Sequence, residues 1–474
     1  MSFPNVRRVS TTNVRPASYT DRDESDDSHK RIDLNPWDLT HLRQLYMQRG
    51  LLFKKSQQAE EETSKESIDN IISRLKTSLS FTLDYFFPLA GRLGIEKHED
   101  DGTVSFYIDC NFEGVEFIHV TAEISAEDIL SPTYTPQSLI NSLFSLNEVK
   151  SYEGSTHPLL SIQINELRDG SIYLACSLNH LVSDGTSFWH FINSWFEMSR
   201  SSSGGCHSPS RPPVFERWFL NDEDSPIRLS FTSEDEILLG VKKSSPPPHG
   251  IVEKCFRFTK TNIAKLKATA NSEIISGTKQ NAAISSLQAV LAHVWIAVTK
   301  ARMGLDCNST ESISFGLMMD DGSKLIPPLS EAYFGNSVSS RKVIAKGDEV
   351  LKKGFVFLAL QLNQVINSQS DENIRSSYMS WIEKPFIVGS GVGTGIISSR
   401  FLARSSHRFN MYGNDFGWGR PIAVKTGMSG KSTDGGTTVN PGPLEGSIDI
   451  EICLPIEVFQ ALENDTEFME AFSS

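Results

Sequence analysis

The sequence predicts an α/β protein with two domains. Its 474 residues exceed what a single hydrophobic core usually holds. Segments with the spacing of strands and of helices alternate along the chain, which is typical of the α/β class. Ser-, Gly- and Pro-rich stretches at 199–213 and 242–250 divide the chain near its middle. We therefore expect four regions: a disordered lead-in at 1–31, a first domain at 32–200, a crossover linker at 201–250 and a second domain at 251–474.

The composition is that of a globular protein and argues against several other classes. No window approaches 18 consecutive apolar residues, so no membrane span is expected. The formal net charge of −13 argues against a sequence-independent nucleic-acid binder. The N-terminal lead-in is polar and lacks the apolar core of a signal peptide, and the six cysteines are scattered without a CxxC pair. We expect a cytoplasmic protein with reduced thiols, and a monomer, because nothing indicates an obligate partner.

One stretch of the first domain places a histidine and an acid close together. The segment 157–182 predicts two strands joined by a hairpin turn at Asp169-Gly170. Alternation along the second strand places these residues on one face: Ile172, Leu174, Cys176, Leu178 and His180. After Gly185, apolar residues recur at the spacing of an amphipathic helix: Phe188, Phe191, Ile192, Trp195 and Phe196. His180 and Asp184 are therefore predicted in a tight connection between a strand and a helix.

Further elements are expected on both sides of the crossover. The helical spacing of "SLSFTLDYFFPLAGRLGI" stops at Pro88. In the second domain, "IAKLKATAN" and "ISSLQAVLAHVWIAVTKAR" have the spacing of helices. The segment "GSIDIEICLPIEVFQALEND" predicts a strand followed by a short helix.

Several short motifs resemble known sites but fail on spacing. "GSGVGTG" at 389–395 has glycines at every second residue, unlike the dinucleotide fingerprint, and we expect a glycine-rich turn or strand there. "GKS" at 430–432 lacks the first glycine of a phosphate-binding loop, because Lys425 stands at that position. "DFG" at 415–417 matches a kinase triplet, but the catalytic loop and the lysine-bearing strand of a kinase are missing.

The sequence also lacks a nucleophile motif and a metal set. It contains no G-x-S-x-G elbow and no Cys/His signature of a thiol protease. His180 and Asp184, even with His190, supply too few metal ligands, and nothing nearby completes a set. At this point His180 is either a packed core residue or the base of an enzyme.

Five segments then occur in a characteristic order. "LSFTLDYFFPLAGRL" comes first, H-x-x-x-D-G follows at 180–185, and "SSLQAVLAHVW" follows the crossover. "YFGN" at 333–336 and "DFGWG" at 415–419 come last. This order and spacing resemble the plant BAHD family of acyl-CoA-dependent acyltransferases, over roughly residues 32–470. HxxxDG alone is a weak signal, but HxxxDG followed by DFGWG is specific.

The resemblance implies a fold, a pair of substrates and roles for residues. The fold would be two similar-sized domains related to chloramphenicol acetyltransferase, with an active-site channel at their interface. The substrates would be acyl-CoA and the hydroxyl or amine of a small specialised metabolite, and no cofactor would be permanently bound. His180 would be the general base, with Asp184 and Gly185 supporting its loop. The DFGWG residues would be structural and lie away from the chemistry: Asp415, Phe416, Gly417, Trp418 and Gly419.

The chemistry of the residues agrees with this role for His180. An acceptor hydroxyl at its own pKa is a poor nucleophile, so a positioned base is needed to remove its proton. A histidine at the end of an apolar strand face should stay neutral near pH 7, because burial disfavours the imidazolium and lowers its pKa. It can then return the proton to the departing thiolate, and no serine or cysteine nucleophile is required.

Two positions depart from the family pattern. The family often supplies oxyanion donors from a Thr-Ser-Trp-like stretch before DFGWG, which corresponds to 404–406 in this chain. Only Ser405 matches, so Ser405 and Arg404 are the candidate oxyanion or channel residues. The family arginine that pairs with the motif aspartate corresponds to Gly322, and Lys324 is the nearest cation.

Asp184 is therefore expected to have other partners, because a carboxylate in a partly desolvated loop needs them. Backbone amides of the turn at 185–188 are expected first, since the acid precedes a helix N-terminus. Lys324 is expected next, and the remaining option is an arginine such as Arg341 or Arg404.

CoA is a polyanion, and in the family some of its phosphate contacts come from the segment around "IAKLKATAN" and the helix that follows. Lys267 and Ser285 are the candidate CoA-binding residues. The alternative is that Lys265 and Lys267 only solvate a helix face.

A different function also stays open at this point, because the two departures from the family pattern fit a catalytically weak or repurposed member. Such a member would be either a small-molecule binding protein or a lyase that reuses the channel.

Overall fold

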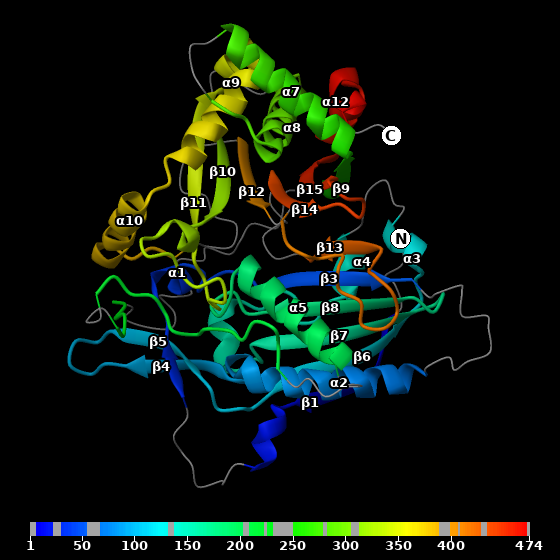
Figure 1. Cartoon of the computed structure of the whole chain (residues 1–474), viewed down its shortest axis with the longest axis vertical. Helices are drawn as coiled ribbons and strands as arrows, with labels where there is room; N and C mark the ends of the chain where they lie inside the picture. The colour runs from blue at the N-terminus through cyan, green and yellow to red at the C-terminus, as the bar shows by residue number, and fades with distance from the viewer. Residues whose placement is uncertain are drawn as a thin grey trace.

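The computed structural model describes most of the chain: residues 6–21, 30–54, 67–130, 137–201, 208–221, 225–230, 250–277, 282–304, 312–387, 399–405, 408–427 and 434–471. Two mixed β-sheets, each with packed helices, form the lower and upper halves of the molecule in Figure 1. The predicted α/β class with two domains is confirmed.

The first sheet is the centre of the N-terminal half. Among the described residues it has six strands, in the spatial order β1 (Val6–Val14), β6 (Val115–Ala122), β7 (Leu160–Leu167), β8 (Ile172–Leu178), β3 (Met47–Phe53) and β13 (Ala423–Thr426). β6 and β7 are parallel, and the other neighbouring pairs are antiparallel. The predicted hairpin is present between β7 and β8, with Gly170 at a φ of 78°, a conformation that glycine adopts without a Cβ clash.

Helices cover both faces of this sheet. The helices of this half are α1 (Pro36–Leu39), α2 (Ile68–Tyr85), α3 (Ala126–Leu130), α4 (Gln137–Ser142) and α5 (Gly185–Ser201). α2 and α5 pack side by side on one face, while α3 and α4 lie against the other. α2 begins at the N-cap Ser67, whose hydroxyl accepts the Asn70 N–H, and ends ahead of Pro88, as predicted.

A small third sheet extends the core of this half. Its strands are, in order, β2 (Arg31–Asp33), β5 (Val104–Asp109) and β4 (Arg92–Lys97). Buried side chains of all three strands, including Ile32, Phe106 and Leu93, belong to the same hydrophobic core as α2 and α5. The chain just after β2 forms α1, which brings the segment 35–42 to the junction of the two halves.

The second sheet is the centre of the C-terminal half. Its described strands are, in order, β11 (Val338–Lys346), β10 (Ser312–Asp320), β12 (Ser399–Ser405), β14 (Gly436–Pro441), β15 (Ile448–Pro455) and β9 (Ile251–Phe258). The pairs β10–β12 and β12–β14 are parallel, and the remaining pairs are antiparallel.

The helices of the C-terminal half pack around one buried helix. They are α7 (Lys260–Gly277), α8 (Ser286–Met303), α9 (Gly347–Asn367), α10 (Asp371–Glu383), α11 (Ile456–Glu463) and α12 (Thr466–Glu470). α8 is buried on nearly all sides and contacts α7, α9, α11 and α12. α7, α8 and the β15–α11 unit are the elements that the sequence predicts for this half.

The C-terminal half contributes one strand to the first sheet. β13 comes from the C-terminal half but pairs with β3 at the edge of the first sheet, where Val424 lies opposite Leu51. Val424 and Phe416 also belong to the hydrophobic core of the N-terminal half. The first sheet is therefore completed by residues that lie beyond the expected domain boundary at 251.

The prediction of a disordered lead-in at 1–31 is wrong for residues 6–14, which form β1. This strand pairs antiparallel with β6, from Val6 opposite Ala122 to Val14 opposite Val115. It is an edge strand whose side chains are mostly exposed, so few large apolar residues are needed. The hydrogen-bonded partner comes from more than 100 residues away, and polar composition alone does not reveal it.

The described parts of the crossover at 201–250 pack into the fold. Val214 pairs with Tyr333 of the C-terminal half, and Leu229 pairs with Val104 of the small sheet. Ile227 and Leu229 are buried. The described parts of the crossover therefore contact both halves of the molecule. None of the helices in the described part of the chain is long and apolar enough to cross a membrane.

Candidate active site

The connection between β8 and α5 holds the histidine and the acid of the HxxxDG motif. β8 ends at Leu178, and α5 begins at Gly185. The buried Asn179 fixes the turn, because its side chain accepts the Leu181 N–H at 2.9 Å and donates to the Ser151 carbonyl at 2.8 Å. His180 therefore lies just after the end of β8, in the tight strand-to-helix connection that the sequence predicts, and the hydrogen bonds of Asn179 constrain its backbone.

The His180 ring is partly exposed although it lies deep in the protein. The pKa of His180 is lowered to about 4, mainly by burial; the charges of Arg404 and Arg49 contribute to the shift, and Asn336 opposes it. Asn336 also holds the backbone, because its side-chain amide donates to the His180 carbonyl at 2.8 Å. His180 is therefore neutral near pH 7, as expected from its place at the end of an apolar strand face.

The Asp184 carboxylate is bound by backbone amides. It is 2% exposed, and its Oδ1 accepts the Ser187 N–H at 3.0 Å while its Oδ2 accepts the Ser337 N–H at 3.1 Å. Burial raises the pKa of Asp184 to about 6, although these two hydrogen bonds oppose the shift. The prediction that an amide of the 185–188 turn binds Asp184 is confirmed, and Ser337 adds a partner from the C-terminal half.

The other expected partners of Asp184 are placed elsewhere. Lys324 is exposed, whereas Asp184 is buried. Arg341 lies 3.8 Å from the Asp321 carboxylate. At Gly322, where the family arginine would stand, a Cβ would lie 2.9 Å from Leu329 Cδ1. A longer side chain at this position would therefore require neighbouring atoms to move.

A different arginine lies beside the HxxxDG loop. Arg217, from the crossover, is buried and donates through Nε to Asp38 Oδ2 at 2.7 Å. It also donates to the carbonyls of Val182 and Phe334, one from each half of the chain. Burial opposes its charge, but Asp38 and, with smaller effects, Tyr333 and Asp184 raise the pKa of Arg217.

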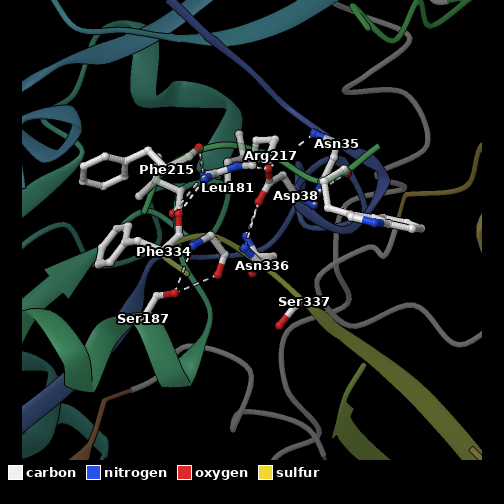
Figure 2. A network of polar contacts seen from close by, with 12 residues as sticks. Asn35, Asp38, Leu181, Ser187, Phe215, Arg217, Phe334, Asn336 and Ser337 are labelled. Carbon is white, nitrogen blue, oxygen red and sulfur yellow. Dashed lines mark hydrogen bonds and ion pairs between the residues drawn. The ribbon is translucent and has the colours of Figure 1, made fainter. Parts of the chain in front are cut away.

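Figure 2 shows Asp38 between Arg217 and Asn336. Asp38 Oδ1 accepts both the backbone N–H of Asn336, at 3.1 Å, and its side-chain amide, at 2.8 Å. The same amide donates to the His180 carbonyl. This polar network, defined by Asp38, Arg217 and Asn336, therefore connects α1, the crossover and the YFGN segment to His180.

Two local features of the chain make this network fit. Asn35 caps α1 and forms a capping box with Asp38, so the short helix presents the Asp38 carboxylate at a fixed place. Gly335 has no side chain, and a Cβ there would lie 2.7 Å from Arg217 Nη1. The glycine of YFGN therefore leaves room for the guanidinium.

The DFGWG segment forms a compact turn against the N-terminal half. Asp415 Oδ1 accepts the N–H groups of Gly417 and Gly419, each at 2.9 Å, and both glycines have a positive φ. Phe416 is fully buried and makes edge contacts with Trp195 and other aromatic rings of the core.

An arginine of α2 secures this turn from outside. Arg74 donates to the Phe416 carbonyl at 2.7 Å, and its guanidinium lies 5.8 Å from the centre of the Trp418 ring. The ring of Trp418 in turn packs edge-on against Phe53 of β3. These contacts fit the expected structural role of the segment.

The two oxyanion candidates lie on β12. The charge of Arg404 contributes to the lowered pKa of His180, and burial lowers the pKa of Arg404 itself to about 10. Ser405 follows it at the end of the strand, opposite Val439 of β14. Ser406 lies outside the described residues.

The two CoA-binding candidates are close to one another. Asn271 accepts the backbone N–H of Ile284 and donates to the Lys267 carbonyl, which joins the Lys267 turn of α7 to the start of α8. The Lys267 side chain is exposed. Ser285 is the N-cap of α8, and its hydroxyl accepts the Gln288 N–H at 3.3 Å. A structural role for Ser285 is therefore visible.

Other candidate groups have structural surroundings. His190 donates to the Arg211 carbonyl at 2.8 Å and packs against Phe86. Burial raises the pKa of the Cys176 and Cys255 thiols, which makes them poor nucleophiles. The motifs at 389–395 and 430–432 lie outside the described residues.

Sequence reasoning missed Asp38, Arg217, the contacts of Asn336, and His41, whose ring stacks on the ring of His180. The Asn-Pro-x-Asp spacing at 35–38 is a helix-start signal and could have located Asp38. Arg217 lies between Phe215 and Trp218, four residues after the Pro-Pro pair at 212–213, and these aromatic neighbours indicate an ordered segment. No local pattern identifies His41, because its contact with His180 joins distant parts of the chain.

Comparisons with known proteins place the chain in a family. The model of the Transferase family matches residues 6–469. An uncharacterized acetyltransferase of Arabidopsis thaliana is 36% identical over 98% of this chain and 99% of its own length. The BAHD acyltransferase DCR of the same organism is 30% identical over 98% of this chain and 92% of its own length.

A solved structure supports the same fold. Vinorine synthase superposes with a TM-score of 0.72 over 99% of both chains, at 18% sequence identity. Fold and sequence together define the class of the protein as an acyltransferase. The chain belongs to the BAHD family of acyltransferases within the Transferase family.

Proposed function

We propose that this protein transfers an acyl group from acyl-CoA to the hydroxyl or amine of a small specialised metabolite, with His180 as the general base. The observation that supports this best is the state of His180 itself. The ring is neutral, partly exposed and held on a fixed turn, while the nearby Asp184 is bound to backbone amides and is not directed at the ring as a partner.

The proposed reaction needs one base and no covalent enzyme intermediate. His180 Nδ1 is buried, so we assign the proton transfer to Nε2. Nε2 accepts the proton of the acceptor O–H or N–H as the freed electron pair attacks the thioester carbonyl carbon. When the tetrahedral intermediate collapses, the C–S bond breaks and the imidazolium returns the proton to the CoA thiolate. The products are the acylated acceptor and free CoA.

The proposal gives other residues supporting roles. Arg404 and Ser405 are the candidates to stabilise the oxyanion, because Arg404 is a cation in the electrostatic surroundings of His180. Asp184 and Gly185 support the catalytic loop, and residues 415–419 support the core beneath α2 and α5. Lys267 is the stronger candidate for a CoA phosphate contact, since Ser285 already caps α8. CoA is a co-substrate in this scheme, and a cytoplasmic location and a monomeric state stay predictions from the sequence.

The test is release of free CoA. The protein is incubated with acetyl-, malonyl-, benzoyl- or coumaroyl-CoA and a plant metabolite extract, and free thiol is followed with and without the extract. We expect release that depends on the extract with at least one donor, together with an acylated product in mass spectrometry. Binding of CoA esters without any release from any donor would support a repurposed binding protein instead.

A further inference from the structure

A second histidine lies directly against the general base. The ring of His41 stacks on the ring of His180, with centroids 4.0 Å apart and planes within 11° of parallel. His41 follows α1, three residues after the buried Asp38. The two histidines are 139 positions apart in the chain, so the contact exists only in the folded protein.

The two rings differ in exposure. His41 is 3% exposed, whereas His180 is partly exposed, so His41 is the more buried residue of the pair. Neither ring nitrogen of His41 makes a well-aligned hydrogen bond to the described residues, although the Gln44 side chain lies near enough to favour a proton on the ring. His41 therefore acts on its neighbour through the face of its ring and not through a hydrogen bond.

His180 lacks the usual means of fixing an imidazole. Catalytic histidines are commonly oriented by a hydrogen bond from Nδ1 to a carboxylate or carbonyl. The Nδ1 of His180 has no such partner in the described part of the chain, and Asp184 is bound by the amides of Ser187 and Ser337. Rotation about the last side-chain torsion of histidine is otherwise broad. A stacked ring restricts that rotation, because turning His180 would drive its edge into His41.

We propose that His41 is a positioning residue for the general base: its ring fixes the plane of His180 and keeps water from one face of it. The inference rests on the proposed function, because it concerns the orientation of the base in acyl transfer. Charged groups around the pair also favour the neutral form of both rings. Burial is the main cause of the lowered pKa of each ring; Arg404 also lowers the pKa of both, and Arg49 lowers that of His180.

Two substitutions separate the effect of a flat stacked ring from the effect of side-chain volume. His41→Phe keeps a flat ring without nitrogens, and His41→Leu keeps an apolar side chain without a flat face. We expect the leucine variant to lose about 10-fold in kcat with little change in KM for acyl-CoA, because a misplaced base slows only the chemical step. The phenylalanine variant should stay within about 3-fold of the wild type.

His293 supplies a matched control. It is also buried, at 5% exposure, and its ring stacks on Phe468 in the C-terminal half. His293→Leu should lower the melting temperature about as much as His41→Leu but leave kcat unchanged. This comparison separates a positional effect at the base from general loss of packing.

The titration of His180 gives a readout that does not need turnover. Burial lowers the His180 pKa, so a variant that admits water to its face should raise that pKa toward the ordinary value. We expect His41→Ala to shift the His180 titration in NMR spectra, and the acid limb of the rate profile, to higher pH. His41→Phe should leave both in place.

Three results would overturn the inference. One is a folded His41→Leu variant with wild-type kcat, and another is a His41→Phe variant as slow as His41→Leu, which would show that the imidazole nitrogens are needed. The third is an unchanged His180 titration in a folded His41→Ala variant. If the wild-type protein releases no CoA from any donor, the proposed function fails, but the NMR titration still tests the contact.

Discussion

At the scale of single residues, His180 and Asp184 are four positions apart and have opposite surroundings. His180 is neutral and partly exposed beside two arginines, whereas Asp184 is buried and bound by two backbone amides. Under the proposed function, the loop presents His180 for proton transfer, whereas Asp184 binds backbone amides that hold the loop. Each group can be tested separately.

Replacing His180 should abolish most of the proposed turnover. Positioned proton transfer contributes about 10²–10⁴-fold to a rate, so His180→Ala should lower kcat by at least about 100-fold. The side chain makes no hydrogen bond through Nδ1 to the described residues, so folding and CoA binding should be nearly intact. Steady-state kinetics and a binding titration check this, and near-normal activity would remove His180 from the mechanism.

Asp184 should make folding stability depend on pH. Its pKa is raised from 3.8 to about 6, because burial disfavours the charged form. The folded state therefore binds the proton more tightly than the unfolded chain, and the resulting stability is present below about pH 4 and lost as the pH rises through 6. A two-unit shift corresponds to about 3 kcal/mol.

The matching variant is Asp184→Asn, which cannot titrate. We expect the free energy of unfolding of the wild type, relative to this variant, to fall by up to about 3 kcal/mol between pH 4 and pH 7. Urea unfolding at a series of pH values measures the difference. A difference that does not change with pH would show that Asp184 is ionised without penalty in the folded protein.

At the scale of elements, the DFGWG turn is built as a support for the N-terminal core. Asp415 closes the turn by binding two glycine amides, and Arg74 of α2 holds it from outside. Phe416 enters the core between β3 and α5. A segment near the end of the chain therefore stabilises elements formed by its first half.

Variants of this turn should lose stability together with activity. Asp415→Ala removes the acceptor of both glycine N–H groups, and Trp418→Ala removes the ring that packs on Phe53. We expect a lower soluble yield and a lower melting temperature for both variants. The free energy of unfolding should fall by about 1–3 kcal/mol in each. A Trp418 variant that is fully stable yet inactive would instead indicate direct participation in the reaction.

At the scale of the whole molecule, the halves are joined by a strand and by a buried ion pair. β13 completes the first sheet from the C-terminal half. The pair between Arg217 and Asp38 lies at the junction of α1, the crossover and the YFGN segment. Because the network of the buried pair donates to the carbonyls of Val182 and His180, the relative placement of the halves also affects the position of His180.

Breaking the buried pair should destabilise the protein strongly. Arg217→Met leaves the Asp38 carboxylate without its cation, and removing one partner of a buried pair typically costs about 3–5 kcal/mol. The double variant with Asp38→Asn should lose less than the sum of the single variants, since the two residues interact directly. Chemical unfolding measures all three.

Another arginine of the crossover provides the control for this prediction. Arg228 pairs with Asp100 and Asp101 at the surface, where solvent screens the charges. Arg228→Met should therefore leave the unfolding midpoint almost unchanged. Equal losses of stability in the two methionine variants would mean that the buried pair contributes no more to stability than the surface pairs.

The local elements near the site could be predicted because their signals span only a few residues. The alternation from Ile172 to Leu178 predicts a strand, and the spacing after Gly185 predicts a helix; both are present. The amide partner of Asp184 followed from the same logic, since unpaired N–H groups gather at the start of any helix. The resemblance carried by HxxxDG and DFGWG added the family, which is confirmed.

The remaining features were decided by tertiary structure, because their partners are far apart in the chain. β1 was missed since an edge strand needs only a neighbouring strand to pair with, and that neighbour begins at Val115. Arg217 and Asp38 are 179 positions apart, and only the packed junction makes their desolvated charges stabilise one another. The sequence by itself determined the elements that flank the site, the family and the candidate base, whereas the fold decided which charges are buried together and which ring lies against His180.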